Sequence, residues 1–376
     1  TPAIALMNRL RYAGKFMLMG VAVLVVMAVL FATVLSNLNR DIRTAKNELE
    51  GVQMLKGVNK LAQFMQQHRG LSSGVLNGNE AMKEKRTAKE KEVADAVNAT
   101  DAAISATLRE SASWKKIRSD WAEIQAQGMT WTPPENIKRH TQMISKALVF
   151  LVDIADDSAL TLDPVMDTYY FMDTIVTKLP AVLEPMGITR ARGTGVLSKK
   201  ELAPQMRIDI ASLIAQMSGT LSAQNNNLEN VVRYAPVLQS TLAGPTKEFS
   251  EGVEKVFALI RDDIFSEKFT TDPKDYFALT TQVIDTGYKV MFDVLMPQFE
   301  QQLTQRMNAA RNMLLLNLGL SLGVMVLVVY LAMGTYFSVV NSVNVFSQGA
   351  HRLADGDLTA QFTTASKDEL HDAGNN

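Results

Sequence analysis

The sequence contains no cysteine and only four histidines among its 376 residues. Without cysteine the chain forms no disulfides and has no thiol chemistry. The histidines, at positions 68, 140, 351 and 371, do not have the close spacing that is typical of a zinc site. The sequence therefore predicts no metal site, and nothing in it indicates another cofactor.

An excess of charge of either sign is also lacking. The chain has 38 basic and 39 acidic side chains and a formal net charge of -1. Proteins that bind nucleic acids usually carry a strongly basic surface, so no nucleic-acid partner is expected. The glycine-containing stretch GITRARGTG lies in a helical pattern and follows no strand, so it is no nucleotide-binding fingerprint. Because no catalytic set of side chains emerges, we do not expect an enzyme.

Charge is missing altogether from two long hydrophobic stretches, Phe16–Asn39 and Met313–Phe337. Each is long enough to cross a bilayer as a helix, which takes about 20 residues. We therefore expect transmembrane helices over 16–39 and 312–337, in contact with membrane lipid.

The charges that flank the first stretch predict its orientation. Arg9, Arg11 and Lys15 precede it with no acidic residue among them, whereas basic and acidic residues are mixed after it. The positive-inside rule then places the N-terminus, 1–15, in the cytoplasm. Residues 40–311 would lie in the periplasm of a bacterium, with the protein in the inner membrane.

Proline and glycine are rare between the two stretches, and apolar residues recur there every three or four positions, as in amphipathic helices. Interruptions are expected at seven places, namely 77–79, 110–113, 132–134, 157–164, 197–200, 234–236 and 270–273. The sequence thus predicts an all-α fold in which two transmembrane helices flank a periplasmic bundle of about eight helices.

Two short motifs occur twice in this segment. QHRGLSSGVL (67–76) and TRARGTGVL (189–197) align so that Arg69 matches Arg190. HTQMISKAL (140–148) also resembles TTQVIDTGY (280–288), in the same order along the chain. We interpret the repeat as two four-helix units, 40–160 and 161–311. Counting helices up and down then places both arginines at the end of the domain farthest from the membrane.

The first motif predicts a site for a small anion. Arginine offers five donors in a fixed fork that suits planar oxyanions, and hydroxyl groups add neutral donors. Gly74 and Gly195 would permit a close approach of the backbone. The candidate ligand-binding residues are Arg69, Ser72, Ser73, Arg190, Arg192 and Thr194, with His68 as a weaker neighbour. A competing interpretation is that both motifs are ordinary helix ends, where basic residues and a following glycine are common.

The segment after the second hydrophobic stretch contains RLADGDL followed by KDEL. It resembles a HAMP module, a signal relay, over residues 338–376, and the module is expected to be incomplete at Asn376. With two anchors and a helical outer domain, the chain resembles the N-terminal half of a methyl-accepting chemotaxis receptor. That resemblance implies a homodimer that signals to cytoplasmic chemotaxis proteins through a further C-terminal domain.

The outer domain, with its RGLSSGVL motif, resembles the nitrate- and nitrite-sensing (NIT) domain. This resemblance implies a small oxyanion ligand bound by arginines at positions such as Arg69 and Arg190.

Several alternatives stay open. The outer domain also resembles the helical bimodular domain, which binds small carboxylates. It could instead bind a periplasmic protein or serve only as a dimerisation stalk, and the output could be a histidine kinase or a diguanylate cyclase.

Overall fold

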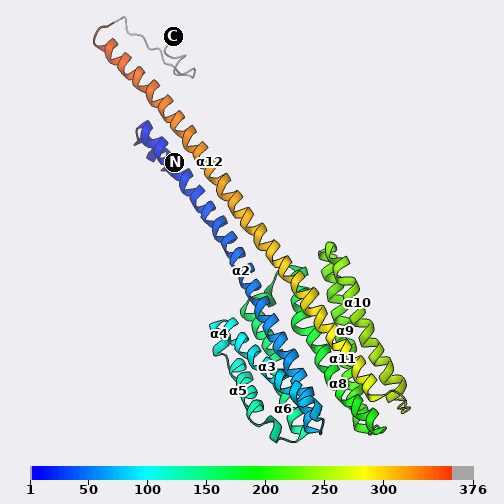
Figure 1. Cartoon of the computed structure of the whole chain (residues 1–376). Coiled ribbons are helices and arrows are strands. Elements are labelled where there is room, and N and C mark those ends of the chain that lie inside the picture. Colours follow the sequence, from blue (N-terminus) through cyan, green and yellow to red (C-terminus); the bar gives the residue numbers. More distant parts are fainter. Residues whose placement is uncertain (1, 358–376) are drawn as a thin grey trace. The chain divides into compact units, whose positions relative to one another are not determined.

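The computed structural model describes residues 2–357, and every regular element in that range is a helix. The predicted all-α fold is confirmed. The elements, shown in Figure 1, are α1 (Pro2–Asn8), α2 (Tyr12–Leu76), η1 (Glu80–Met82), α3 (Lys83–Ala103), α4 (Ala106–Glu110), α5 (Ala112–Gln127), η2 (Gly128–Thr130), α6 (Pro133–Asp157), η3 (Leu160–Leu162), α7 (Met166–Asp173), η4 (Thr174–Lys178), α8 (Leu179–Lys199), α9 (Pro204–Tyr234), η5 (Pro236–Leu238), α10 (Gln239–Leu259), η6 (Ile260–Ile264), α11 (Pro273–Lys289), η7 (Val290–Leu295) and α12 (Met296–Ala354).

The boundaries between these helices follow local sequence chemistry. All seven expected interruptions separate helices in the structure. Thr132 begins α6 by accepting a hydrogen bond from the N–H of Glu135, and Asp272 begins α11 in the same way. Within the Arg43–Met307 unit, one interruption was not predicted. Ser105 caps the short helix α4 where neither proline nor glycine marks a break.

Three of the helices contain a π-helical segment rather than a break. The segments are η4 between α7 and α8, η6 at the end of α10, and η7 between α11 and α12. Each inserts a wide turn that shifts the helix face, the helix continues beyond η4 and η7, and such segments often occur near functional sites. As a result, one uninterrupted helix runs from Pro273 to Ala354.

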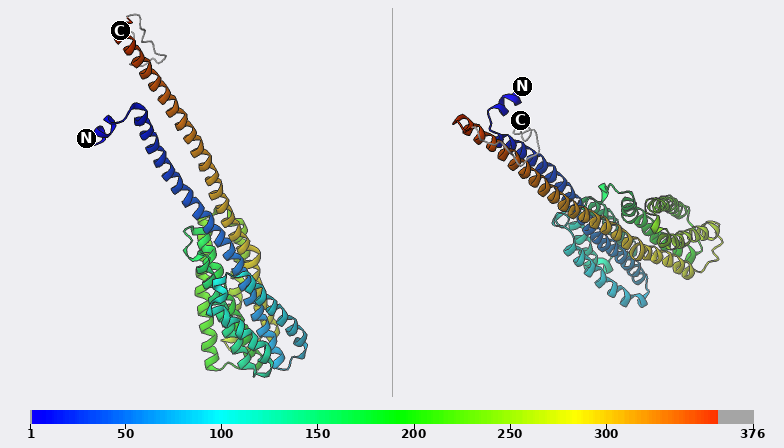
Figure 2. Two further views of the ribbon diagram at one scale, coloured as in Figure 1. Left: turned by 90° about the vertical axis from the view of Figure 1, so that its left-hand side faces the viewer. Right: turned by 90° about the horizontal axis from the view of Figure 1, so that it is seen from above.

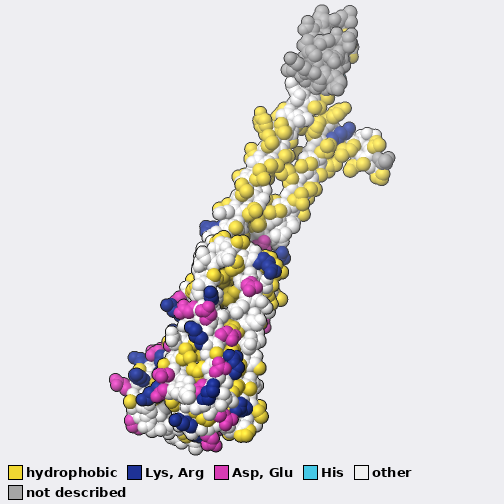
Figure 3. Space-filling model, turned by 90° about the vertical axis from the view of Figure 1, so that its right-hand side faces the viewer, with side chains coloured by type: hydrophobic (Ala, Val, Ile, Leu, Met, Phe, Trp, Pro, Cys, Tyr) yellow, Lys and Arg dark blue, Asp and Glu magenta, His cyan; other side chains and the backbone are white. Residues whose placement is uncertain are grey.

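The chain divides into two compact units, one formed by 1–42 with 308–376 and the other by Arg43–Met307. In the described part of the first unit, the apolar stretches of α2 and α12 run alongside each other (Figures 1 and 2). Hydrophobic side chains cover their surface (Figure 3), and the most apolar windows contain no buried residue. By length and composition, both helices can cross a membrane.

The Arg43–Met307 unit is built around one continuous hydrophobic core. The core extends from Val52 in α2 to Leu303 in α12 and includes the fully buried rings of Trp114, Phe150 and Phe299. Burial of each such side chain contributes about 1.5–3 kcal/mol to folding. Because both predicted four-helix halves contribute to this core, they are packed together, and their division at residue 160 stays a prediction.

The proposed HAMP segment lies only partly within the described residues. Helix α12 continues to Ala354, and Gly356 then adopts a φ of +93°, a left-handed conformation that favours glycine and turns the chain. The expected KDEL segment, at 367–370, lies outside the described residues. The HAMP assignment and the other expected domain limits therefore stay predictions.

Candidate functional site

Arg69 lies in α2, where the fold surrounds it with side chains from two other helices. Its Nη1 donates to Glu184 Oε1 of α8 at 2.6 Å and to Thr141 Oγ1 of α6 at 2.8 Å. Its Nη2 donates to Glu184 Oε2 at 3.1 Å. Both residues of this ion pair are buried. The two parallel hydrogen bonds to one carboxylate are the strong, directional arrangement that a guanidinium favours.

Arg190 lies in α8 and has a different set of partners. Its Nη1 donates to Thr281 Oγ1 of α11 at 2.8 Å, and the guanidinium stacks over the Phe277 ring at 4.8 Å from the centroid. Among the described residues, no carboxylate lies within 4.0 Å of it. Burial lowers the pKa of Arg190, and the nearby charge of Arg69 lowers it further. Arg190 therefore keeps several donors available in a partly buried position.

The two arginines occupy equivalent places in the sequence repeat. Arg69 and Arg190 match in the first motif, Thr141 and Thr281 match in the second, and both Arg–Thr hydrogen bonds measure 2.8 Å. The repeat thus produces the same Arg–Thr contact twice. This agrees with the sequence, in which the two motifs occur in the same order in both halves.

Glycines bring the two guanidiniums close to the opposite helix. A Cβ atom at Gly187 of α8 would lie 3.4 Å from Arg69 Nη2, and one at Gly70 of α2 would lie 3.9 Å from Arg190 Nη2. Each arginine thus approaches the helix that carries the other arginine. The two guanidinium charges therefore lie in the same region of the bundle, each within van der Waals reach of a glycine on the opposite helix.

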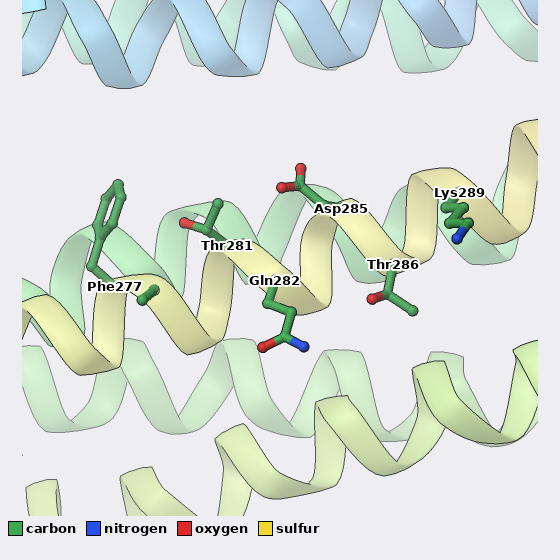
Figure 4. Close-up of a pocket in the computed structure, with 7 residues that line it drawn as sticks. Phe277, Thr281, Gln282, Asp285, Thr286 and Lys289 are labelled. Carbon is green, nitrogen blue, oxygen red and sulfur yellow. The ribbon is translucent and has the colours of Figure 1, made fainter.

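An open groove of about 500 Å³ runs along α11 beside Arg190. Figure 4 shows that Phe277, Thr281 and Asp285 point to one side of the helix, whereas Gln282 and Thr286 point to the other. Phe277 and Thr281 are the two side chains that contact Arg190. Two of the residues that line the groove therefore contact the Arg190 side chain.

A buried chain of hydrogen bonds holds Glu184 in place. Gln66 Nε2 donates to Glu184 Oε2 at 2.8 Å, and Tyr288 Oη donates to Gln66 Oε1 at 2.8 Å. Burial and the charge of Glu184 raise the pKa of the Tyr288 hydroxyl, so it stays a protonated donor at neutral pH. These hydrogen bonds connect Arg69 with Tyr288 in the last turn of α11, two residues before η7 begins.

The other predicted ligand-binding residues lie away from the two guanidiniums. Ser72 accepts a hydrogen bond from Arg86 Nε at 3.3 Å, and Ser73 bonds Asn77 near the end of α2. Arg192 pairs with Asp209, at 3.2 Å. Thr194 Oγ1 donates to the carbonyl of Arg190 in its own helix at 2.8 Å. Of the six candidates, the structure brings only Arg69 and Arg190 together.

Gly74 and Gly195, one from each copy of the first motif, do not bring the backbone close to the arginines. A Cβ at Gly74 would lie 2.3 Å from Met82 Sδ, so Gly74 allows the packing of η1, and the Gly195 position faces open space. Helix capping does not explain the arginines either. The Arg69 guanidinium bonds side chains of α6 and α8, and the left-handed residues that end α2 and α8 are Gly78 and Lys200.

Comparison with known families identifies the sensor segment. Residues 60–308, more than half of the chain, match the model of the NIT family, described as nitrate and nitrite sensing. The chain belongs to the NIT family. No curated protein matches the chain. A solved structure, titled "Structure of the NasR transcription antiterminator", is similar with 13% identity and a TM-score of 0.45, over 87% of this chain and 88% of the other.

Several residues around the two arginines could not be recognised from the sequence. Thr141 and Thr281 stood in the second repeated motif, which was the available signal for them. Glu184, Gln66 and Tyr288 have no counterpart in the repeat, since glycine occupies position 187 where Gln66 would match. Only the packing of α2, α8 and α11 reveals that these three side chains are connected by hydrogen bonds.

A second polar cluster in the NIT unit surrounds His68. His68 Nδ1 lies 2.8 Å from His140 Nε2, and His140 Nδ1 lies 2.8 Å from the Asn136 carbonyl. Burial lowers the pKa of His68 to about 2 and that of His140 to about 4, so both are neutral at physiological pH. Within residues 2–357, no group of three potential metal ligands occurs, and we assign this pair a packing role.

Proposed function

We propose that this chain is the sensor part of a membrane receptor that binds a small oxyanion, of the nitrate and nitrite class, between Arg69 and Arg190. Membership in the NIT family supports the ligand class. The observation that carries the proposal is the pairing of the two repeat arginines, each held by a threonine at 2.8 Å. An anion between them would relieve their repulsion and accept their remaining hydrogen bonds.

The open side of the site is that of Arg190. Its guanidinium lacks a carboxylate partner within 4.0 Å among the described residues, and it contacts Thr281 and Phe277, which line the groove along α11. A planar anion with three or two oxygens can accept two parallel hydrogen bonds from such a fork. Partial burial strengthens the interaction, because water screens the charges less than at a free surface.

A small carboxylate is the second candidate ligand. Glu184 already presents a carboxylate to Arg69 with distances of 2.6 and 3.1 Å, so the geometry accepts that group. Formate or acetate would bind Arg190 with the same two oxygens. The arginines alone do not distinguish formate and acetate from nitrite.

The proposed signal travels along the helix that follows the site. Helices α11, η7 and α12 form one continuous helix from Pro273 to Ala354, which contains the second apolar stretch. Ligand binding would change the relative stability of two positions of this helix, by the difference in its affinity for them. In our proposal a HAMP module passes the change to a cytoplasmic chemotaxis domain of a homodimer in the bacterial inner membrane, and a histidine kinase or diguanylate cyclase output is the alternative.

Thermal unfolding of the full chain in lipid nanodiscs tests the ligand. Nitrate at 100 times its dissociation constant should add about 2.7 kcal/mol to the free energy of unfolding. Arg190→Ala should abolish this gain. Arg192→Ala is the matched control, because Arg192 lies on the same helix but pairs with Asp209. Equal stabilisation of both variants by nitrate, or no stabilisation of the unmodified chain by any small anion, would contradict the proposal.

A further inference from the structure

The charges around the proposed anion site are unequal. Arg69 and Arg190 contribute two positive charges, and Glu184 contributes one negative charge within ion-pair distance of Arg69. Asp285 of α11 also acts on Arg190 and raises its pKa more than Glu184 does. Asp285 is nevertheless exposed to solvent and forms no ion pair among the described residues, so it lies outside the buried part of the site. The buried part of the site therefore has a net charge of one positive unit.

Glu184 is fixed in this position from both sides. Arg69 binds both of its oxygens, and Gln66 donates to Oε2 at 2.8 Å. Gln66 is itself held by the buried Tyr288 hydroxyl at 2.8 Å. Three hydrogen bonds hold the two oxygens of this carboxylate, so we expect Glu184 to keep its position when an anion binds. The negative charge of Glu184 is therefore present in the site both with and without a bound anion.

We propose that Glu184 determines which anions the site accepts, by restricting it to a single negative charge. A monovalent anion beside Arg190 neutralises the remaining positive unit. A divalent anion such as sulfate would leave a buried excess of negative charge close to the Glu184 carboxylate, and uncompensated buried charge is strongly unfavourable. This inference rests on the proposed function and adds the residue that sets the selectivity.

Removal of the Glu184 charge is the direct test. The full chain in nanodiscs is titrated with sodium nitrate and sodium sulfate, and both dissociation constants are measured by calorimetry. The unmodified chain should prefer nitrate, and Glu184→Gln should shift the ratio of the two constants toward sulfate by about tenfold or more, since one charge at close range is worth at least about one factor of ten. Asp209→Asn is the control, because it removes a carboxylate that pairs with Arg192 outside the site.

Addition of a charge tests the same idea without altering a buried ion pair. Thr281 is half-buried on α11 and contacts Arg190. Thr281→Asp would bring the net charge to zero, whereas Thr281→Asn has nearly the same shape and leaves it unchanged. We expect Thr281→Asp to bind nitrate at least about tenfold more weakly than Thr281→Asn. This pair keeps the proposal testable if Glu184→Gln does not fold.

The outcomes separate this inference from the proposed function. If the unmodified chain binds neither anion, the anion site itself is refuted. If it binds nitrate but Glu184→Gln keeps the same nitrate-to-sulfate ratio, Glu184 does not set the selectivity. Equal nitrate affinity in Thr281→Asp and Thr281→Asn would also overturn the inference. A shift toward sulfate in Glu184→Gln that is absent in Asp209→Asn supports it.

Discussion

At the scale of single residues, the environment of each arginine decides its role. Arg69 and Arg190 occupy the same position of a repeated motif, yet one is paired with a buried carboxylate and the other is not. Arg192 is only two residues from Arg190 and forms a peripheral ion pair with Asp209. Residue type and spacing were enough to select the two arginines that the fold brings close together. They could not show which charges face them.

The carboxylate of Asp263 gives a prediction about pH. Burial alone would raise its pKa, but the backbone N–H groups of Thr270 and Thr271, each at 2.9 Å, together with their side chains, lower the pKa to about 2. An unfolded aspartate has a pKa of about 3.9. Since the folded value is the lower one, Asp263 stabilises the fold above about pH 4 and loses this contribution as the pH falls toward 2.

Asp263→Asn should therefore reduce the free energy of unfolding by about 2 kcal/mol at pH 7 and by much less near pH 2. Chemical denaturation at a series of pH values measures this difference. Asp262→Asn is the control, because Asp262 is exposed and pairs only with Arg261 at the surface. A loss of stability for Asp263→Asn that stays constant between pH 7 and pH 2 would contradict the assigned hydrogen bonds.

At the scale of helices, one ion-pair cluster joins three elements of the sensor unit. Arg306 of α12 pairs with Asp163 at 2.6 Å, just before α7, and also with Glu48 of α2. Glu48 is fully buried and Asp163 is nearly so. Removal of the shared cation would leave two buried carboxylates without it, a change that costs about 3–5 kcal/mol.

Arg306→Met should accordingly lower the free energy of unfolding of the full chain by about 3–5 kcal/mol. Arg261→Met, which removes an exposed arginine paired with Asp262, should lower it by less than about 1 kcal/mol. Thermal or urea unfolding of the two variants compares them directly. Similar small losses in both would mean that the buried cluster does not hold α2 and α12 together.

The sequence predicted where the helices begin and end better than it predicted the backbone conformation inside them. Proline, Asn-Gly and capping residues mark the seven interruptions, because backbone chemistry acts locally. The Ser105 break was missed, since an N-cap serine looks like any other serine without its partner. The π-helical segments η4, η6 and η7 were also missed. They depend on how neighbouring helices pack, and no residue type specifies them.

At the scale of the whole molecule, the repeat explains why a single site can draw on both halves of the sensor unit. Each half supplies an arginine on one helix and a threonine on another, and the two arginines approach each other across Gly70 and Gly187. The sequence located this pair through its repeated motifs. It could not locate Glu184, Gln66 or Tyr288, because these residues come from three helices and break the symmetry of the repeat.

The stoichiometry of anion binding tests the shared site most directly. Isothermal titration calorimetry of the full chain in nanodiscs with sodium nitrate should give one bound anion per chain. Either Arg69→Met or Arg190→Ala should abolish the signal, because the anion needs both guanidiniums, while Arg192→Ala should leave it intact. Two anions per chain, each lost with only one arginine, would show that the repeat forms two independent sites and would contradict the account.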